Sequence, residues 1–110
     1  MTGSGIVFMT ASSREEADLI ANELVGKKLA ACVNILPQIK SVYWWEGKIC
    51  RDMEVFCIAK TTKALFPKLL EHVKKLHSYM VPEILFIPIQ DGLPEYLDWI
   101  QTVTSKTIPV

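Results

Sequence analysis

The sequence predicts an α+β fold whose elements follow the order β-α-β-β-α-β, with one further helix near the C-terminus. Three features of the chain predict it. Short apolar runs have the composition of strands, two stretches repeat apolar residues at helical spacing, and residues 29–62 have the pattern of a long β-hairpin. With 110 residues, half of them hydrophobic, we expect a single domain over residues 1–110, with Met1–Gly5 as a disordered end.

The first strand and the first helix are predicted between residues 6 and 25. Ile6–Met9 is a short apolar run typical of a buried strand. Ser12 or Ser13 can cap the helix that follows, because each has a glutamate three residues later in the chain. The apolar face of this helix is formed by residues three or four apart, namely Ala17, Ile20, Ala21, Leu24 and Val25.

The hairpin joins two extended runs, Ala31–Trp45 and Lys48–Thr61, through Glu46-Gly47. Glycine accepts the positive φ that a tight turn needs. An arm of about 15 residues, at roughly 3.3 Å per residue, would be about 45–50 Å long, whereas a compact domain of this size is only about 35 Å across. We therefore expect the hairpin to protrude from its own domain.

The two arms of the hairpin should occupy different places in the sheet. Pro37 lies within the first arm, so this segment should be an edge strand or carry a bulge. The alternation loses phase near Lys40–Val42, which predicts a bulge and a bend there as well. The second arm is apolar over its inner half, Val55–Ala59, and this pattern predicts a central strand.

A second amphipathic helix is predicted from Leu65 to Leu76. Pro67 belongs in its first turn, where the missing N–H costs nothing. The stretch His77–Pro82 should end the helix, because the residue before a proline is disfavoured in the helical region.

The last strand and helix complete the predicted sheet. Glu83–Ile89 is largely apolar, and Pro88 marks it as an edge strand, since proline cannot donate to a ladder. Pro94 starts a C-terminal helix, and Ser105–Val110 is predicted to be either a strand or disordered. The order is that of a ferredoxin-like sandwich, one antiparallel sheet of four strands with two helices on one face.

The strands are too apolar for a sheet that has one face in water. Such strands should alternate apolar and polar residues, but Ile6–Met9, Val55–Ala59 and Glu83–Ile89 are apolar on both faces. The second face and the protruding hairpin therefore both need cover, which predicts an oligomer. Hairpins that each reach a neighbour close a ring, and three subunits make the natural small ring. The residues assigned to this trimer interface are Tyr43, Trp44 and Trp45.

Composition and charge exclude several classes of function. The formal net charge is zero, so we expect no nucleic-acid partner and no membrane partner. No run approaches the ~20 apolar residues of a membrane span, and no secretory signal is visible. Cys32, Cys50 and Cys57 fit reduced cytosolic thiols better than a disulfide framework. No nucleophile–base constellation is apparent, so we predict a cytoplasmic protein that is not an enzyme and has no catalytic residues.

Several motifs occur together in this chain, and the resemblance that they carry runs from about Ile6 to Val103. They are Leu29-Ala30-Ala31-Cys32-Val33-Asn34, then Ile39-x-Ser41-x-Tyr43-x-Trp45-x-Gly47, then Lys60-Thr61, then His77-x-Tyr79-x-x-Pro82-Glu83-Ile84, then Pro88 and Gly92, and Tyr96-Leu97-x-Trp99. This joint pattern resembles the CutA family of divalent-cation tolerance proteins. The resemblance implies a ferredoxin-like fold assembled as a homotrimer, similar in architecture to the PII nitrogen-signalling proteins. It also implies a link to copper and other divalent metals.

A metal site is the first candidate that the resemblance suggests, and this chain departs from the family pattern in two places. The family usually has His-Pro-Tyr-Glu where this chain has His77-Ser78-Tyr79-Met80. A first-strand cysteine is associated with copper binding in bacterial members, and Met9 stands at its place. The candidate ligands are thus His77 and, as a source of sulfur, Met9 first, with Met80 or Cys32 as alternatives; this soft set would suit copper(I). In the alternative interpretation, His77 bonds the last carbonyls of its helix.

Two functions stay open at this stage. The first is a homotrimeric cytosolic protein of copper or other divalent-cation tolerance, which binds the metal but requires no cofactor. The second is a PII-like sensor or scaffold that binds a small molecule in clefts between subunits, without a specific metal site. Cys32 could instead be a small core residue, and Lys60 a surface lysine. The residues that could line such a cleft are Cys32, Lys60, Tyr79 and Glu83.

Overall fold

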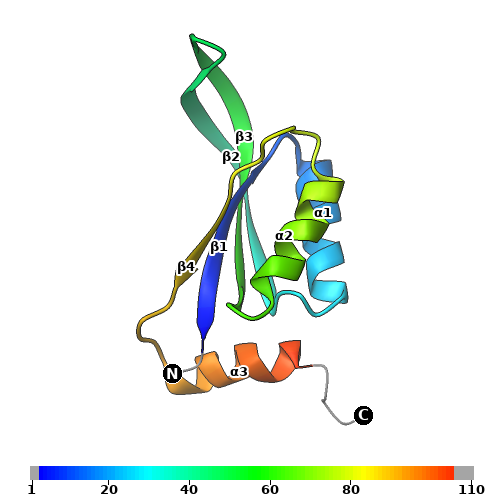
Figure 1. The fold of residues 1–110 in the computed structure, drawn as a ribbon, viewed down its shortest axis with the longest axis vertical. Helices are drawn as coiled ribbons and strands as arrows, with labels where there is room; N and C mark the ends of the chain where they lie inside the picture. The colour runs from blue at the N-terminus through cyan, green and yellow to red at the C-terminus, as the bar shows by residue number, and fades with distance from the viewer. Residues whose placement is uncertain (1–2, 106–110) are drawn as a thin grey trace.

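A four-stranded antiparallel sheet and three helices form the fold (Figure 1). This computed structural model describes residues 3–105. The strands lie in the order β2-β3-β1-β4, so the predicted ferredoxin-like arrangement is confirmed, with β3 inside the sheet and β2 and β4 at its edges. The elements are β1 (Ser4–Ala11), α1 (Arg14–Gly26), β2 (Cys32–Trp45), β3 (Lys48–Thr62), α2 (Phe66–Leu76), β4 (Ile84–Pro88) and α3 (Pro94–Thr104).

Strand β1 begins earlier than the sequence suggested. Met1–Gly5 was expected to be disordered, but Ser4 and Gly5 pair with the end of β3 and are buried. A Cβ on Gly5 would lie 2.1 Å from the ring of Phe86 in β4, so the glycine permits close packing that a side chain would prevent. The small residues at the N-terminus suggested disorder, but a small residue at position 5 is what the packing against Phe86 requires. Met1 and Thr2 lie outside the described residues, as does most of the predicted tail, residues 106–110.

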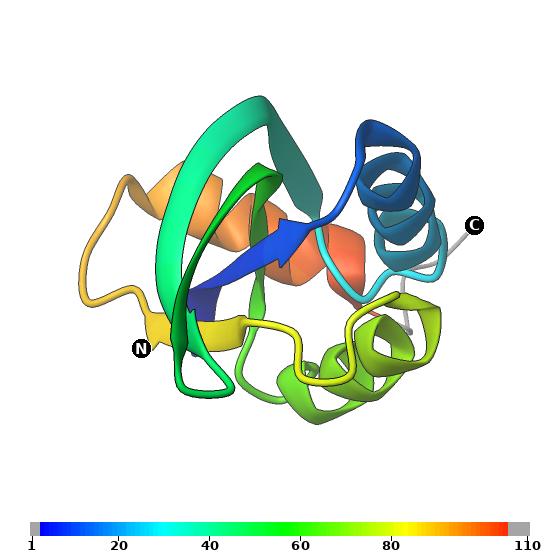
Figure 2. The ribbon, with the colours of Figure 1, turned by 90° about the horizontal axis from the view of Figure 1, so that it is seen from above.

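Helices α1 and α2 lie side by side on one face of the sheet (Figures 1 and 2). Ser13 is the N-cap of α1, and its hydroxyl accepts a hydrogen bond from the Glu16 N–H at 3.1 Å. The Glu16 carboxylate accepts in return from the Ser12 N–H at 2.8 Å, so both serines take part in the cap. The buried side chains between these helices and the sheet include Val7, Met9, Ala17, Ile20, Leu24, Val55, Cys57, Ala59, Leu69 and Val73.

The β2–β3 hairpin extends beyond the helices, as the sequence predicted, and gives the molecule extents of 49 × 27 × 22 Å (Figure 1). Its turn uses positive φ at both central residues, 51° at Glu46 and 76° at Gly47. The strand register shifts between Leu36 and Ile39, around the predicted Pro37 irregularity. Pairing is unbroken beyond Ile39, so the expected second irregularity near Lys40–Val42 is absent. Residues 42–49 are exposed on both faces of the arm, so no apolar alternation is needed there.

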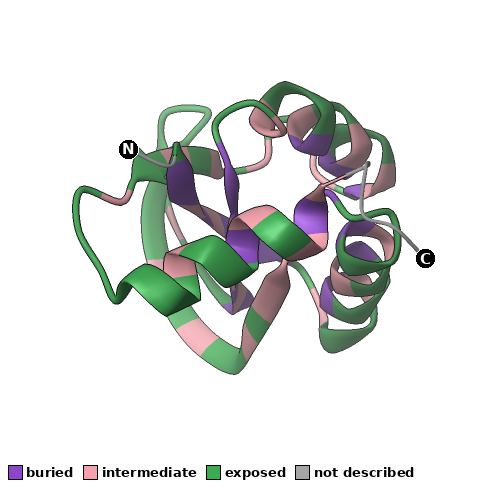
Figure 3. Cartoon of the chain, turned by 90° about the horizontal axis from the view of Figure 1, so that it is seen from below, coloured by how far each residue is buried: buried purple, intermediate pink, exposed green. Residues whose placement is uncertain are grey.

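Helix α3 covers one end of the second sheet face, which is the face away from α1 and α2 (Figure 3). From the sequence, only other chains were expected to cover this face. Ile100 of α3 is fully buried there, and the Gln101 side chain donates to the Ser4 hydroxyl at 3.3 Å. Farther along the same face, β4 leaves Leu85 54% exposed, and Leu36 and Ile87 are also exposed. The second face is therefore apolar, as predicted, and only partly covered. Among residues 3–105, no helix is long and apolar enough to cross a membrane.

Candidate functional site

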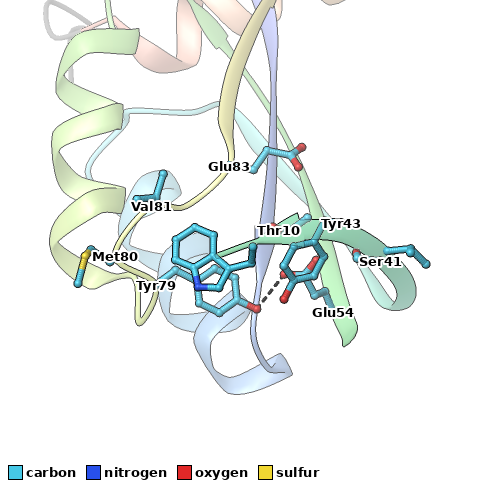
Figure 4. Close-up of a pocket in the computed structure, with 10 residues that line it drawn as sticks. Thr10, Ser41, Tyr43, Glu54, Tyr79, Met80, Val81 and Glu83 are labelled. Carbon is cyan, nitrogen blue, oxygen red and sulfur yellow. Dashed lines mark hydrogen bonds between the residues drawn. The ribbon is translucent and has the colours of Figure 1, made fainter. Parts of the chain in front are cut away.

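A cavity of about 560 Å³ opens at the base of the hairpin (Figure 4). Three parts of the chain enclose it: the arm of β2 and β3, the end of β1, and the loop 77–83 that connects α2 to β4. None of these parts forms the cavity without the other two. The residues that line it are Thr10, Ser41, Val42, Tyr43, Trp45, Glu54, Tyr79, Met80, Val81 and Glu83.

The carboxylate of Glu16 anchors the loop 77–83 to the start of α1. One oxygen accepts from the N–H and the hydroxyl of Ser12, at 2.8 and 2.9 Å, and the other accepts from the Ser78 N–H at 2.7 Å. Burial acts to raise the pKa of Glu16, but these hydrogen bonds outweigh it, so the pKa lies below its ordinary value. The Ser78 N–H is available for this bond because the chain has serine at position 78, where the CutA pattern has proline, which lacks an N–H.

His77 supports the same loop from inside, and both of its ring nitrogens have protein partners. Nε2 lies 2.6 Å from the carbonyl oxygen of Thr10 and therefore donates to it. Nδ1 is then free to accept, and it accepts from the Tyr79 N–H at 3.0 Å. The imidazole thus bonds a carbonyl of β1, whereas the alternative interpretation had proposed the last carbonyls of its own helix. It would have to give up one of these bonds before it could ligate a metal.

The second predicted metal ligand, Met9, lies in the core and is 1% exposed. Neither Met9 nor His77 lines the cavity. Within residues 3–105, no three His, Cys, Asp or Glu side chains are grouped as a metal site would require. The geometry therefore does not favour the soft copper(I) site that the sequence suggested at these two residues.

The most heavily buried charge at the cavity is Glu54, which the sequence analysis did not single out. It is 9% exposed, and its one hydrogen-bond donor among the described side chains is the hydroxyl of Tyr79, at 2.8 Å (Figure 4). No Lys, Arg or His within residues 3–105 forms an ion pair with it. Burial, followed by the negative charge of Glu54, raises the pKa of Glu83 at the cavity wall. The site is therefore acidic and lacks a cation of its own.

Aromatic side chains form another part of the cavity lining. Tyr43 and Trp45 come from β2, and Tyr79 comes from the loop 77–83. The Tyr43 hydroxyl donates to Asp52, and this bond, more than burial, raises the Tyr43 pKa to about 12. Trp44, the third aromatic residue assigned to a subunit interface, does not line the cavity and is strongly exposed. The assignment of these residues to an interface stays a prediction.

The structure divides the four residues that were expected to line a cleft. Tyr79 and Glu83 line the cavity, but Cys32 and Lys60 do not. Those two pair directly across β2 and β3, where the Lys60 ammonium group donates to the side-chain oxygen of Asn34. Sequence reasoning missed Glu54, although one signal was available. A carboxylate directly before the apolar run of β3 is unusual in a strand that lies inside a sheet.

Comparison with known proteins places this geometry in context. The family described as CutA1 divalent ion tolerance protein matches residues 5–103. The chain is 50% identical over 100 residues to the divalent-cation tolerance protein CutA of Thermus thermophilus, covering 91% of this chain and 97% of that protein. It is 44% identical over 102 residues to the chloroplastic protein CutA 1 of Oryza sativa subsp. japonica, covering 93% of this chain but spanning only 58% of that relative.

A solved structure gives the same result for the fold. The structure described as the periplasmic divalent cation tolerance protein CutA from Archaeoglobus fulgidus superimposes with a TM-score of 0.90. The two chains are 48% identical, and the superposition covers 93% of this chain and 99% of that one.

Proposed function

The chain belongs to the CutA1 family of divalent ion tolerance proteins, and from this premise we propose that it acts as a homotrimer that binds a divalent cation. The observation that carries the proposal is Glu54, a carboxylate buried at a cavity whose lining also includes Glu83 but no Lys, Arg or His. A buried charge of this kind is costly unless it is paired, so a cation from outside the chain would stabilise it.

The proposed donors are oxygen atoms, and this changes the expected chemistry. Carboxylate oxygens suit hard and borderline divalent cations, whereas the imidazole and sulfur first expected would suit copper(I). Copper(II) stays among the candidate cations. His77 then acts indirectly, because its bonds to Thr10 and Tyr79 hold the loop 77–83 that completes the cavity.

Two surfaces support a trimer. The second sheet face leaves Leu36, Leu85 and Ile87 in water, and the hairpin exposes Trp44 near its end. At ~25 cal/mol per Å² of apolar surface, covering a few hundred Å² would drive association strongly. Light scattering should therefore give about three times the 12.4 kDa mass of one chain. A monomeric mass for a folded sample at micromolar concentration would contradict the trimer.

Binding is the proposed mode of action, with no catalytic step, no required cofactor and no nucleic-acid or membrane partner. The formal net charge of zero supports the absence of a polyanionic partner, and the names of the relatives describe tolerance, not catalysis. A cytosolic location is part of the proposal and is supported by the three free cysteines.

Calorimetric titration with Cu²⁺, Zn²⁺ and Mg²⁺ tests the cation site. Glu54→Gln keeps the shape of the side chain and removes its charge, so binding should weaken at least ~10-fold, the size of losing one close charged ligand. Glu95→Gln is the matched control, since Glu95 is exposed on α3 and distant from the cavity lining. If His77→Gln abolished binding while Glu54→Gln retained it, the cation would bind at the histidine and the carboxylate site would be wrong.

A small-molecule sensor is the second candidate, and the cavity itself favours it. Its volume of about 560 Å³ lies in the range of small-ligand pockets, and its lining is mainly apolar with a few convergent polar groups. This candidate and the first share the same cavity, so they differ only in the ligand that the cavity accepts.

A further inference from the structure

We propose that the cavity at the base of the hairpin recognises a small organic ammonium ion, with Glu54 and Glu83 as counter-charges and Tyr43, Trp45 and Tyr79 as aromatic contacts. The inference rests on the second function proposed above, the small-molecule sensor, and names the chemical class of its ligand.

The charge of the lining selects a cation. Two of the ten lining residues are carboxylates, and none is Lys, Arg or His. Glu54 is buried and receives one hydrogen bond from a neutral hydroxyl, so its charge is not balanced by any described residue. An anionic ligand would add a further negative charge to a partly desolvated site that already holds two carboxylates. A cation reduces the imbalance of charge, and a neutral ligand leaves it in place.

The aromatic residues favour an organic cation over a metal ion. A cation placed against the face of Trp or Tyr is attracted by the ring quadrupole, and sites for quaternary ammonium groups are built from several such rings. Tyr43, Trp45 and Tyr79 bring three rings to this one cavity from two separate segments. A small metal ion would bind the carboxylate oxygens and leave these rings without a role.

The size and the remaining lining fit an ion that carries alkyl groups. A cavity of about 560 Å³ is far larger than a coordination sphere and is the size that small-molecule ligands occupy. Val42, Met80 and Val81 contribute apolar surface for alkyl substituents. Thr10 and Ser41 add hydroxyl groups that can bond a polar end of the ligand. The site is therefore matched to a compact amine or quaternary ammonium compound.

The decisive experiment compares two probes of one shape. Choline and 3,3-dimethylbutan-1-ol differ only in that a neutral carbon replaces the cationic nitrogen. Both are titrated into the intact protein by calorimetry in the presence of EDTA, which removes metal ions. Choline should bind at least ~10-fold more tightly, because only the charged probe gains the carboxylate and ring attraction. Equal affinities, or no binding of choline, would overturn the proposal.

Variants locate the binding. Glu54→Gln and Trp45→Leu should each weaken choline at least ~10-fold, with little effect on the neutral probe. Trp99→Leu is the matched control for Trp45, because Trp99 is 41% exposed against 47% for Trp45 but lies on α3 and does not line the cavity. Glu95→Gln serves the same purpose for Glu54. Equal losses in the controls would place choline elsewhere and overturn the proposal; circular dichroism and light scattering verify that each variant is folded and assembled.

The outcome also separates this inference from the functions on which it depends. If the neutral alcohol binds as tightly as choline and Trp45→Leu weakens both, the sensor function stands and the ammonium class is wrong. If divalent cations bind in the metal titration while choline does not, the cation-tolerance proposal stands and the inference falls.

Discussion

Two glutamates, the half-buried Glu16 and the buried Glu54, lie against the loop 77–83, and they differ in the hydrogen bonds that the protein provides. Glu16 accepts three hydrogen bonds, from Ser12 and Ser78, and its pKa is lowered. Glu54 accepts one, from the neutral hydroxyl of Tyr79, and it faces a cavity. A satisfied carboxylate holds the fold together, whereas a carboxylate left without a counter-charge is available to a ligand. The contrast separates structural from functional charge in one small region.

The largest effect is expected from Glu16→Gln. An amide has one acceptor and one donor group, so its NH₂ would face either the Ser12 or the Ser78 N–H, and two donors cannot bond each other. The loss should be about 2 kcal/mol of unfolding free energy, the scale of hydrogen bonds to a charged group. Urea denaturation measures it, with the exposed neighbour Glu15→Gln as control. A loss below about 0.5 kcal/mol would show that the anchor is not structural.

Glu16 at the loop anchor and Glu83 at the cavity wall should also respond to pH in opposite directions. Glu16 has a folded pKa below its usual 4.5, so its stabilisation is complete above pH 4.5 and is lost as pH falls through the lower folded value. Glu83 has a folded pKa above 4.5, so its favourable contribution is complete below pH 4.5 and is lost as pH rises through the higher value.

Urea denaturation at a series of pH values, from the acid range up to neutral, measures the free energy of unfolding and checks the direction of both pH dependences. Glu16→Gln should flatten the loss of stability on the acid side of pH 4.5, and Glu83→Gln should remove the decline above it. If Glu16→Gln changed the stability only above pH 4.5, or Glu83→Gln only below it, the assignment of these pH dependences to the two residues would be wrong.

Glu54→Gln should have the opposite effect to Glu16→Gln. The same substitution is expected to stabilise the folded protein at position 54 and to destabilise it at position 16. The amide oxygen can still accept from Tyr79, and the unpaired buried charge is gone. We expect a gain of about 1 kcal/mol in a ligand-free sample, measured by the same denaturation. A loss of about 2 kcal/mol would mean that Glu54 is a structural residue like Glu16, and the site proposals would lose their basis.

A third glutamate, Glu46, lies outside both environments and should give the smallest effect. It occupies the first central position of the hairpin turn with a φ of 51°, a conformation that asparagine tolerates better. Glu46→Asn should raise the unfolding free energy by about 0.5 kcal/mol. Thermal denaturation would detect it, and a lower melting temperature would show that the glutamate side chain has a role in the turn.

The sequence predicted the fold well because the signals of its elements are local. Helix α1 followed from apolar residues three or four apart, and the hairpin turn followed from Gly47 between two extended runs. The start of β1 was not predicted. Glycine is required at position 5 only because Phe86, which is distant in the sequence, packs against it. Nothing in residues 1–5 alone shows that contact.

The candidate site was predicted only in part, for a similar reason. Tyr79 and Glu83 line the cavity within one chain, whereas their place in a cleft between subunits stays a prediction. The predicted metal ligand His77 has both ring nitrogens bonded, one to Thr10 and one to Tyr79, and its position in the sequence does not reveal these bonds. Glu54 was missed, because its importance depends on which charges surround it, and spacing along a strand does not reveal those charges.

Periodicity by itself determined the order of the strands and helices, the length of the hairpin and the apolar character of both sheet faces. Hydrophobic spacing acts over a few residues, so a single chain displays it completely. Only the tertiary structure decided which carboxylate is satisfied and which is left facing a cavity. That distinction depends on residues 10, 43, 54 and 79 lining one cavity. These residues are far apart in the sequence, and only folding brings them together.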